Sequence, residues 1–114
     1  MVETAHNAVG IKTLVKQIGL ETYKELHIII GIMTDKDVEE VLKLLPKYAH
    51  YYISKANVSR GMEVEVLASH FLQQKLNFKK YSSISKALKN AKKLAHKDDL
   101  LIVTGSVFVV AEVI

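Results

Sequence analysis

The 114-residue sequence contains no cysteine, which excludes disulfide bonds, thiolate zinc sites and a cysteine nucleophile. No apolar run approaches the ~20 residues that a membrane helix needs. The opening residues 1–4 lack the basic and apolar regions of a signal peptide. We therefore expect a cytoplasmic protein with no membrane partner.

Proline is also scarce, with one residue, and no low-complexity tract is present. The length suits one domain. Hydrophobic residues make up 49% and charged residues 25% of the chain, which are ordinary globular values. These features together predict a single compact core.

Two common phosphate-binding motifs are missing as well. The sequence has no dinucleotide fingerprint and no Gly-x-x-x-x-Gly-Lys-[Ser/Thr] loop. Its five histidines show no HExxH or comparable ligand spacing, so we expect no metal site in this chain. The sequence therefore offers neither of these two ways of holding a nucleotide phosphate.

What the sequence does have is an excess of lysine, with a formal net charge of +4. Many lysines cluster at Lys75, Lys79, Lys80, Lys86, Lys89, Lys92, Lys93 and Lys97. Either a nucleic-acid footprint or the solvated face of a helix would give this pattern. Neither arginines nor aromatic residues are interleaved to read or stack bases, which favours the solvated face and no nucleic-acid partner.

Hydrophobic periodicity alternates between a helical and a strand type along the chain. It predicts helices over residues 8–19, 38–45, 64–72, 83–95 and 107–114, and strands over residues 26–33, 50–55, 78–81 and 100–104. Thr34 and Asp37 resemble a capping box before the second helix. Within the strands and helices, His27 and His70 are expected to be structural or exposed.

Regular alternation of helices and strands is typical of a layered α/β domain with a mostly parallel sheet flanked by helices. In such sheets, function lies in the loops that follow the carboxyl ends of the strands. The corresponding segments here are 33–36, 55–61, 81–83 and 104–107.

Several polar residues in or near these loops have both a functional and a structural interpretation. His6 and Asn7, close to Glu3, form a set suited to a polyphosphate or a carboxylate, but Asn7 also fits a helix cap. Arg60 either clamps an anion or pairs with Glu63.

Two further groups of residues also have both a functional and a structural interpretation. Gly105-Ser106 opens the last predicted helix and is either an anion site or a tight turn. Asp35 and Asp37 offer carboxylates for a hard cation, although helix capping explains Asp37 at least as well.

In order along the chain, four segments resemble the C-terminal domain of folylpolyglutamate and dihydrofolate synthases, members of the Mur ligase superfamily. Residues 3–10 (Glu-Thr-Ala-His-Asn-Ala-Val-Gly) resemble the family's Asp-Gly-Ala-His-Asn-Pro-x-Gly box. Residues 31–37 resemble its Gly-Met-x-x-Asp-Lys-Asp box, residues 59–62 its Pro-Arg-Ala-Leu/Met stretch, and residues 103–113 its terminal Thr-Gly-Ser-Leu-Tyr-x-x-Gly-Glu-Val. The departures include Glu3 for Asp, Thr4 for Gly, Ser59 for Pro and Phe108 for Tyr.

The resemblance implies a Rossmann-like three-layer domain that closes over ATP bound mainly, with Mg²⁺, by a preceding central domain. L-Glutamate and a pterin or folate carboxylate would be the other substrates. By resemblance, Glu3, His6 and Asn7 face ATP or its phosphates, His6 and Ser106 hold glutamate, and Arg60 and Lys36 are further candidates. No catalytic residue is expected to act in this domain alone.

We accordingly expect residues 1–114 to be one domain of a larger ligase, cut close to a polar cluster at its start and within an apolar helix at its end. Two alternatives remain at this stage. One is the C-terminal domain of a muropeptide ligase, although residues 57–60 lack the Asp-Asn-Pro-Arg loop usual there. The other is a free-standing α/β regulatory or interaction module.

Overall fold

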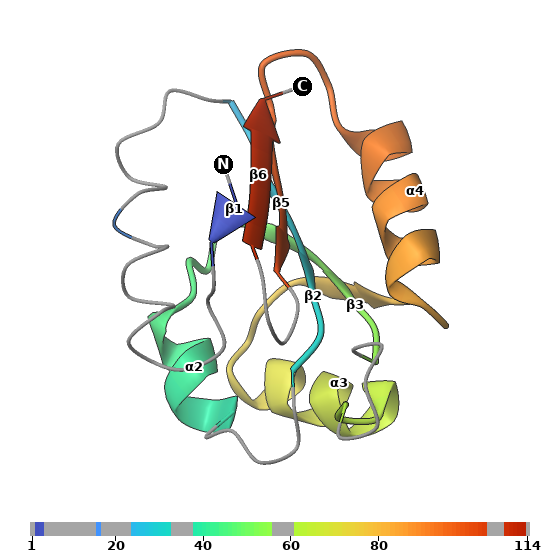
Figure 1. Cartoon of the computed structure of the whole chain (residues 1–114). Helices are drawn as coiled ribbons and strands as arrows, with labels where there is room; N and C mark the ends of the chain where they lie inside the picture. The colour runs from blue at the N-terminus through green and yellow to red at the C-terminus, as the bar shows by residue number, and fades with distance from the viewer. Residues whose placement is uncertain are drawn as a thin grey trace.

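A computed structural model describes residues 2–3, 16, 24–32, 38–55, 61–104 and 109–113 of the chain. Six strands form one sheet in the spatial order β1-β6-β5-β2-β3-β4. They are β1 (Val2–Glu3), β2 (Leu26–Ile30), β3 (His50–Ile53), β4 (Phe78–Lys80), β5 (Leu100–Thr104) and β6 (Val109–Val113). The helices α2 (Val38–Leu44), α3 (Val64–Gln73) and α4 (Ile84–Leu94) connect strands that run in the same direction (Figure 1).

Strands β5, β2, β3 and β4 are parallel, which confirms the predicted mostly parallel sheet. All five residues of β2 are buried, because strands flank it on both sides and helices cover both of its faces. A strand in this position needs an apolar run rather than an alternating pattern. This explains the continuous apolar residues from Leu26 to Ile30.

The prediction of a helix over residues 107–114 is wrong. Residues 109–113 form strand β6, which pairs antiparallel with β5 and on its other side with β1. Three of its five residues are valines, and β-branched side chains favour a strand when a partner edge is available. Strand β1 was not expected either, since a two-residue strand has no readable period.

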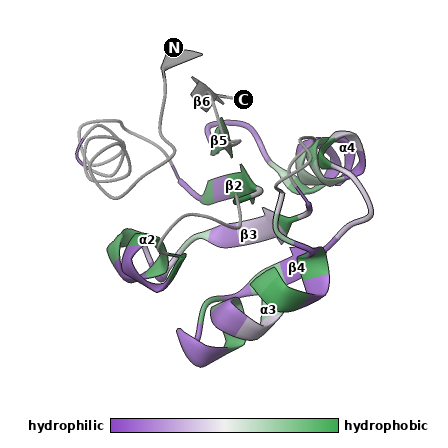
Figure 2. Cartoon of the chain, turned by 60° about the horizontal axis from the view of Figure 1, so that its bottom comes forward, coloured by the Kyte–Doolittle hydropathy of each residue, from purple (hydrophilic) through white to green (hydrophobic). Residues whose placement is uncertain are grey.

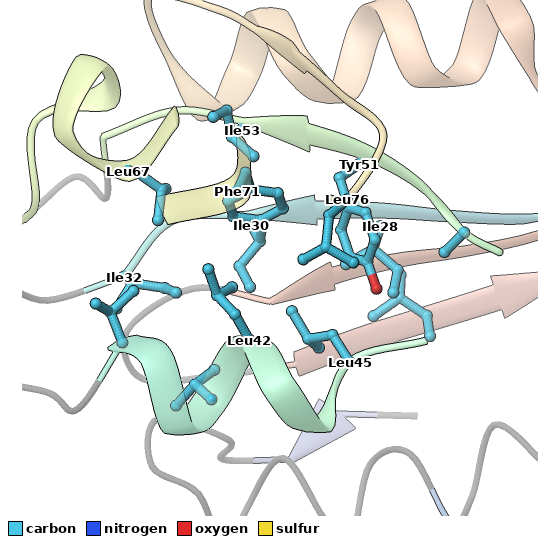
Figure 3. Close-up of a cluster of buried hydrophobic side chains, with 14 of the residues drawn as sticks. Ile28, Ile30, Ile32, Leu42, Leu45, Tyr51, Ile53, Leu67, Phe71 and Leu76 are labelled. Carbon is cyan, nitrogen blue, oxygen red and sulfur yellow. The ribbon is translucent and has the colours of Figure 1, made fainter. Parts of the chain in front are cut away.

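The two faces of the sheet carry separate hydrophobic clusters. On one face, Ile28, Ile30 and Ile53 pack against Leu42 of α2 and Phe71 of α3 (Figure 3). The Phe71 ring meets the Tyr51 ring edge to face, with centroids 5.3 Å apart, an arrangement that aromatic pairs prefer.

On the other face, Ile29, Tyr52 and Leu101 pack against Ala87 and Ala91 of α4. Figure 2 shows α3 and α4 on different sides of the strands. The domain therefore has three layers, as predicted.

Helix α4 begins at Ile84, one residue after the predicted start, and Ser83 is its N-cap. The Ser83 hydroxyl accepts a hydrogen bond from the backbone N–H of Lys86 at 3.1 Å. Ser83→Ala is expected to lower the free energy of unfolding by about 1 kcal/mol, because that N–H loses its partner. Urea denaturation would measure the loss, and Ser82→Ala, at the exposed neighbouring position, should leave the midpoint unchanged.

Two predicted features lie outside the described residues. Of the predicted helix 8–19, only Lys16 is described, and it is helical. The capping box of Thr34 and Asp37 falls wholly outside. Within the described part of the chain, no helix is long and apolar enough to cross a membrane.

Candidate functional site

The carboxyl ends of the parallel strands lie in one row across the sheet. Ile30 of β2 is paired in register with Thr104 of β5 and with Ile53 of β3. The antiparallel strands extend the same row, because Thr104 is opposite Val109 and Val109 is opposite Glu3. In spatial order the row consists of Glu3, Val109, Thr104, Ile30, Ile53 and Lys80.

This row is where the chain enters the segments that carry the candidate site residues. The backbone of Glu3 belongs to the row itself. His6, Asn7, Lys36, Arg60 and Ser106 lie outside the described residues, so their roles stay predictions. The structure nevertheless brings together the strand ends that precede them, which are far apart in the sequence.

Backbone hydrogen bonds also hold both ends of the segment between β3 and α3 close to the carboxyl end of β2. The Ser54 N–H donates to the Ile30 carbonyl oxygen at 3.2 Å, and the Met62 N–H donates to the Ile32 carbonyl oxygen at 2.7 Å. Lys55 and Glu63, at the two ends of the segment, form an ion pair at 3.0 Å. Met62, two residues after Arg60 in the sequence, is therefore anchored to the residues that directly follow β2.

At the amino ends of the parallel strands, which form the opposite edge of the sheet, the structure contains a buried polar cluster that was not predicted from the sequence. His27 lies between Asp99 and Tyr52: its Nε2 is 2.9 Å from Asp99 Oδ2, and its Nδ1 is 2.8 Å from the Tyr52 hydroxyl. All three residues are less than 5% exposed. For a neutral ring, Nε2–H donates to the Asp99 carboxylate and Nδ1 accepts from the Tyr52 hydroxyl.

Asp99 is the centre of this cluster. Its carboxylate also accepts hydrogen bonds from the backbone N–H groups of Glu25, at 3.2 Å, and His96, at 2.8 Å. Burial alone would raise the pKa of Asp99, but the N–H groups of His96 and Glu25 and the His27 ring outweigh it and lower that pKa below its ordinary value. Burial, with Tyr81 and Asp99 nearby, raises the pKa of Tyr52 to about 12, so its hydroxyl is protonated at neutral pH.

A pocket of about 330 Å³ opens beside the cluster. The His50 ring stacks on His27 at 5.2 Å between centroids, and Asn77, Leu94 and His96 complete much of the wall. The side chains of His27, Tyr52 and Asp99 already have hydrogen-bond partners in one another. The cluster therefore holds the loop before β5 against β2 and leaves none of these three groups unpaired for a ligand.

Comparison with known proteins decides the family. The sequence matches the Mur ligase, glutamate ligase domain, over residues 1–107. The chain belongs to this family. It is 34% identical over 115 residues to a probable bifunctional folylpolyglutamate synthase/dihydropteroate synthase of Haloferax volcanii, covering 98% of the chain and 14% of that protein. It is 27% identical over 117 residues to a dihydrofolate synthase/folylpolyglutamate synthase of Buchnera aphidicola, covering 98% of the chain and 27% of that protein.

Among solved structures, the chain is similar to a bifunctional folylpolyglutamate synthase/dihydrofolate synthase from Yersinia pestis complexed with AMPPNP and a Mn ion. The TM-score is 0.79 with 25% identity, over 90% of this chain and 24% of that one. The glutamate ligase domain thus has the fold that the motifs implied, and it spans a minor part of the length of each of these relatives.

The buried carboxylate makes the stability of this glutamate ligase domain depend on acid pH. The pKa of Asp99 is lower in the folded state than its unfolded value of about 3.8, so its contribution is complete above that value. The contribution is lost as the pH falls through the folded-state pKa. Urea denaturation at pH 6, 4 and 3 should show a steep loss of stability below pH 4, and a shallower one in Asp99→Asn. Equal slopes in both proteins would show that another group controls the acid limb.

Proposed function

We propose that this glutamate ligase domain is the C-terminal domain of a longer, cytoplasmic, ATP-dependent enzyme that joins L-glutamate to the carboxylate of a dihydropteroate or folate. The observation that carries the proposal is the single row of strand ends. It joins at one edge the segments whose sequences resemble the folylpolyglutamate synthase motifs. The family and the names of the two curated relatives support the same reaction.

The reaction needs activation, because a carboxylate resists attack by an amine and hydroxide is a poor leaving group. ATP transfers its γ-phosphoryl group to the carboxylate oxygen and forms an acyl phosphate with release of ADP. The glutamate amino group then attacks the acyl carbon, the C–O bond to phosphate breaks, and the amide forms. Positioning of the reactants and neutralisation of phosphate charge are the enzyme's main tasks.

In this proposal Glu3, His6 and Asn7 face ATP or its phosphates, and His6 and Ser106 hold the incoming glutamate. Arg60 and Lys36 are further anion contacts. ATP and Mg²⁺ are held mainly by the central domain of the same enzyme. The described residues offer no group of three His, Asp or Glu side chains that could hold a cation.

The test is glutamate-dependent ADP release by the full-length protein, with dihydropteroate and a reduced folate offered separately. We expect release with at least one of them and none from the 114-residue chain alone, whose sequence contains no Gly-x-x-x-x-Gly-Lys-[Ser/Thr] motif. The substrate that supports release shows whether the first glutamate or later ones are added. Turnover by the isolated chain, or no release with any pterin or folate, would contradict the proposal.

A further inference from the structure

Helix α4 carries a cluster of exposed lysines, whereas Lys80 of the strand before it is paired with Glu65 of α3 at 3.1 Å. Residues 66–97 contain eight lysines and neither aspartate nor glutamate. Lys86, Lys89, Lys92 and Lys93 of α4 are all exposed. None of them takes part in an ion pair with a carboxylate of the described residues. Such a surface attracts anions from solution.

The lysines occupy one side of the helix. Lys86, Lys89 and Lys93 follow the i, i+3, i+7 spacing of a single helical face, and successive residues of this set are roughly 4.5 and 6 Å apart along the axis. Ala87 and Ala91 point the other way and are fully buried against the sheet. Figure 2 shows this division of α4 into hydrophobic and hydrophilic residues. The lysine face, defined as Lys86, Lys89 and Lys93, is therefore turned away from the core.

The lysine face also starts next to the candidate site. The Tyr81 N–H donates to the Ile53 carbonyl oxygen at 2.9 Å, and Ile53 belongs to the row of strand ends. Helix α4 begins three residues later and runs back toward the opposite edge, where the His96 N–H bonds to Asp99. An extended ligand that leaves the row of strand ends can therefore lie along the lysine face from Lys86 to Lys93.

We propose that the lysine face binds the γ-linked oligoglutamate tail of the folate substrate or product. This inference rests on the proposed function, in which each cycle adds one glutamate and therefore one carboxylate to the tail. The growing tail is a flexible polyanion with regularly repeated charges. Lysine side chains are flexible and carry a point charge, so they match such a tail better than they match a rigid, planar anion. Nucleic acid fits less well, because residues 66–97 lack arginine and α4 presents no aromatic side chain for base stacking.

The test measures binding of fluorescein-labelled γ-linked oligoglutamates, from diglutamate to octaglutamate, to the 114-residue chain by anisotropy at low salt. Affinity should rise with tail length and fall with added salt, since the contacts are exposed ion pairs. The triple variant Lys86→Gln, Lys89→Gln, Lys93→Gln should bind octaglutamate about tenfold more weakly.

A matched control removes the same charge elsewhere. Lys24→Gln, Lys43→Gln, Lys47→Gln changes three exposed lysines outside α4 and should bind octaglutamate nearly as well as the unaltered chain. Equal losses in the two triple variants, or no dependence on tail length, would overturn the inference. So would tighter binding of a single-stranded oligonucleotide of equal charge through the same three lysines. Oligoglutamate binding without any ADP release by the full-length protein would instead refute the proposed function alone.

Discussion

His6→Ala in the full-length protein is expected to lower kcat/KM for glutamate at least ~100-fold, the usual effect of removing one positioned polar group that stabilises a transition state. The residue is three positions beyond Glu3, which lies in the row of strand ends. In the proposed reaction its imidazole serves both the phosphates and the incoming amino acid. The measurement is the initial rate of ADP release at varied glutamate concentration.

His96→Ala is the matched control for this variant. His96 is exposed at the opposite edge of the sheet, and alanine keeps the backbone N–H that bonds to Asp99. Its kcat/KM should change less than about threefold, as for other surface substitutions. Similar losses in the two variants would place the reaction away from the row of strand ends.

Asp99→Ala is expected to lower the free energy of unfolding by about 3–5 kcal/mol, because three donors lose a charged acceptor in a buried site. These donors are the His27 ring and the backbone N–H groups of Glu25 and His96. The Asp99 carboxylate connects the start of β2 to the loop before β5. Its removal therefore breaks a connection between the two central strands of the sheet. Chemical denaturation at neutral pH measures the effect.

Two asparagine variants sharpen this prediction. Asp99→Asn keeps an acceptor oxygen and should lose less stability than Asp99→Ala. Asp98→Asn removes a neighbouring exposed charge, and asparagine tolerates the positive φ of 75° at that position, so its midpoint should barely move. A loss in Asp98→Asn as large as that in Asp99→Ala would show that net charge, and not the buried cluster, is responsible.

The interior of the fold could be predicted because each element has a local pattern of its own. Strand β2 is an apolar run because helices cover both faces of the sheet. The spacing of apolar residues in α3 and α4 follows from the packing of one side of each helix against the sheet. Residues 107–114 were mistaken for a helix because short apolar runs have no distinctive period, and the state of residues 109–113 was decided by the open edge of β5. That edge is a tertiary feature that periodicity does not report.

The position of the candidate site could be predicted from the sequence, but the buried polar cluster could not. Parallel strands place their carboxyl ends at one edge, so the loops could be grouped from the order of the predicted elements, and the motif resemblance named the family independently. The cluster of His27, Tyr52 and Asp99 could not be predicted, since its members are up to 72 residues apart in sequence. A histidine inside a fully apolar strand was the available signal, because such a group requires a buried partner.

The most direct test of the proposed site is where ligands contact this domain. Amide chemical shifts of the ¹⁵N-labelled chain would be followed during titration with Mg²⁺–AMPPNP and L-glutamate at millimolar concentration. We expect shifts in the residues that directly follow the row of strand ends, Gly31, Ile32, Ser54 and Lys55, with none in His50 or other residues of the pocket at the opposite ends of the strands. Shifts confined to that pocket would contradict the placement of the site.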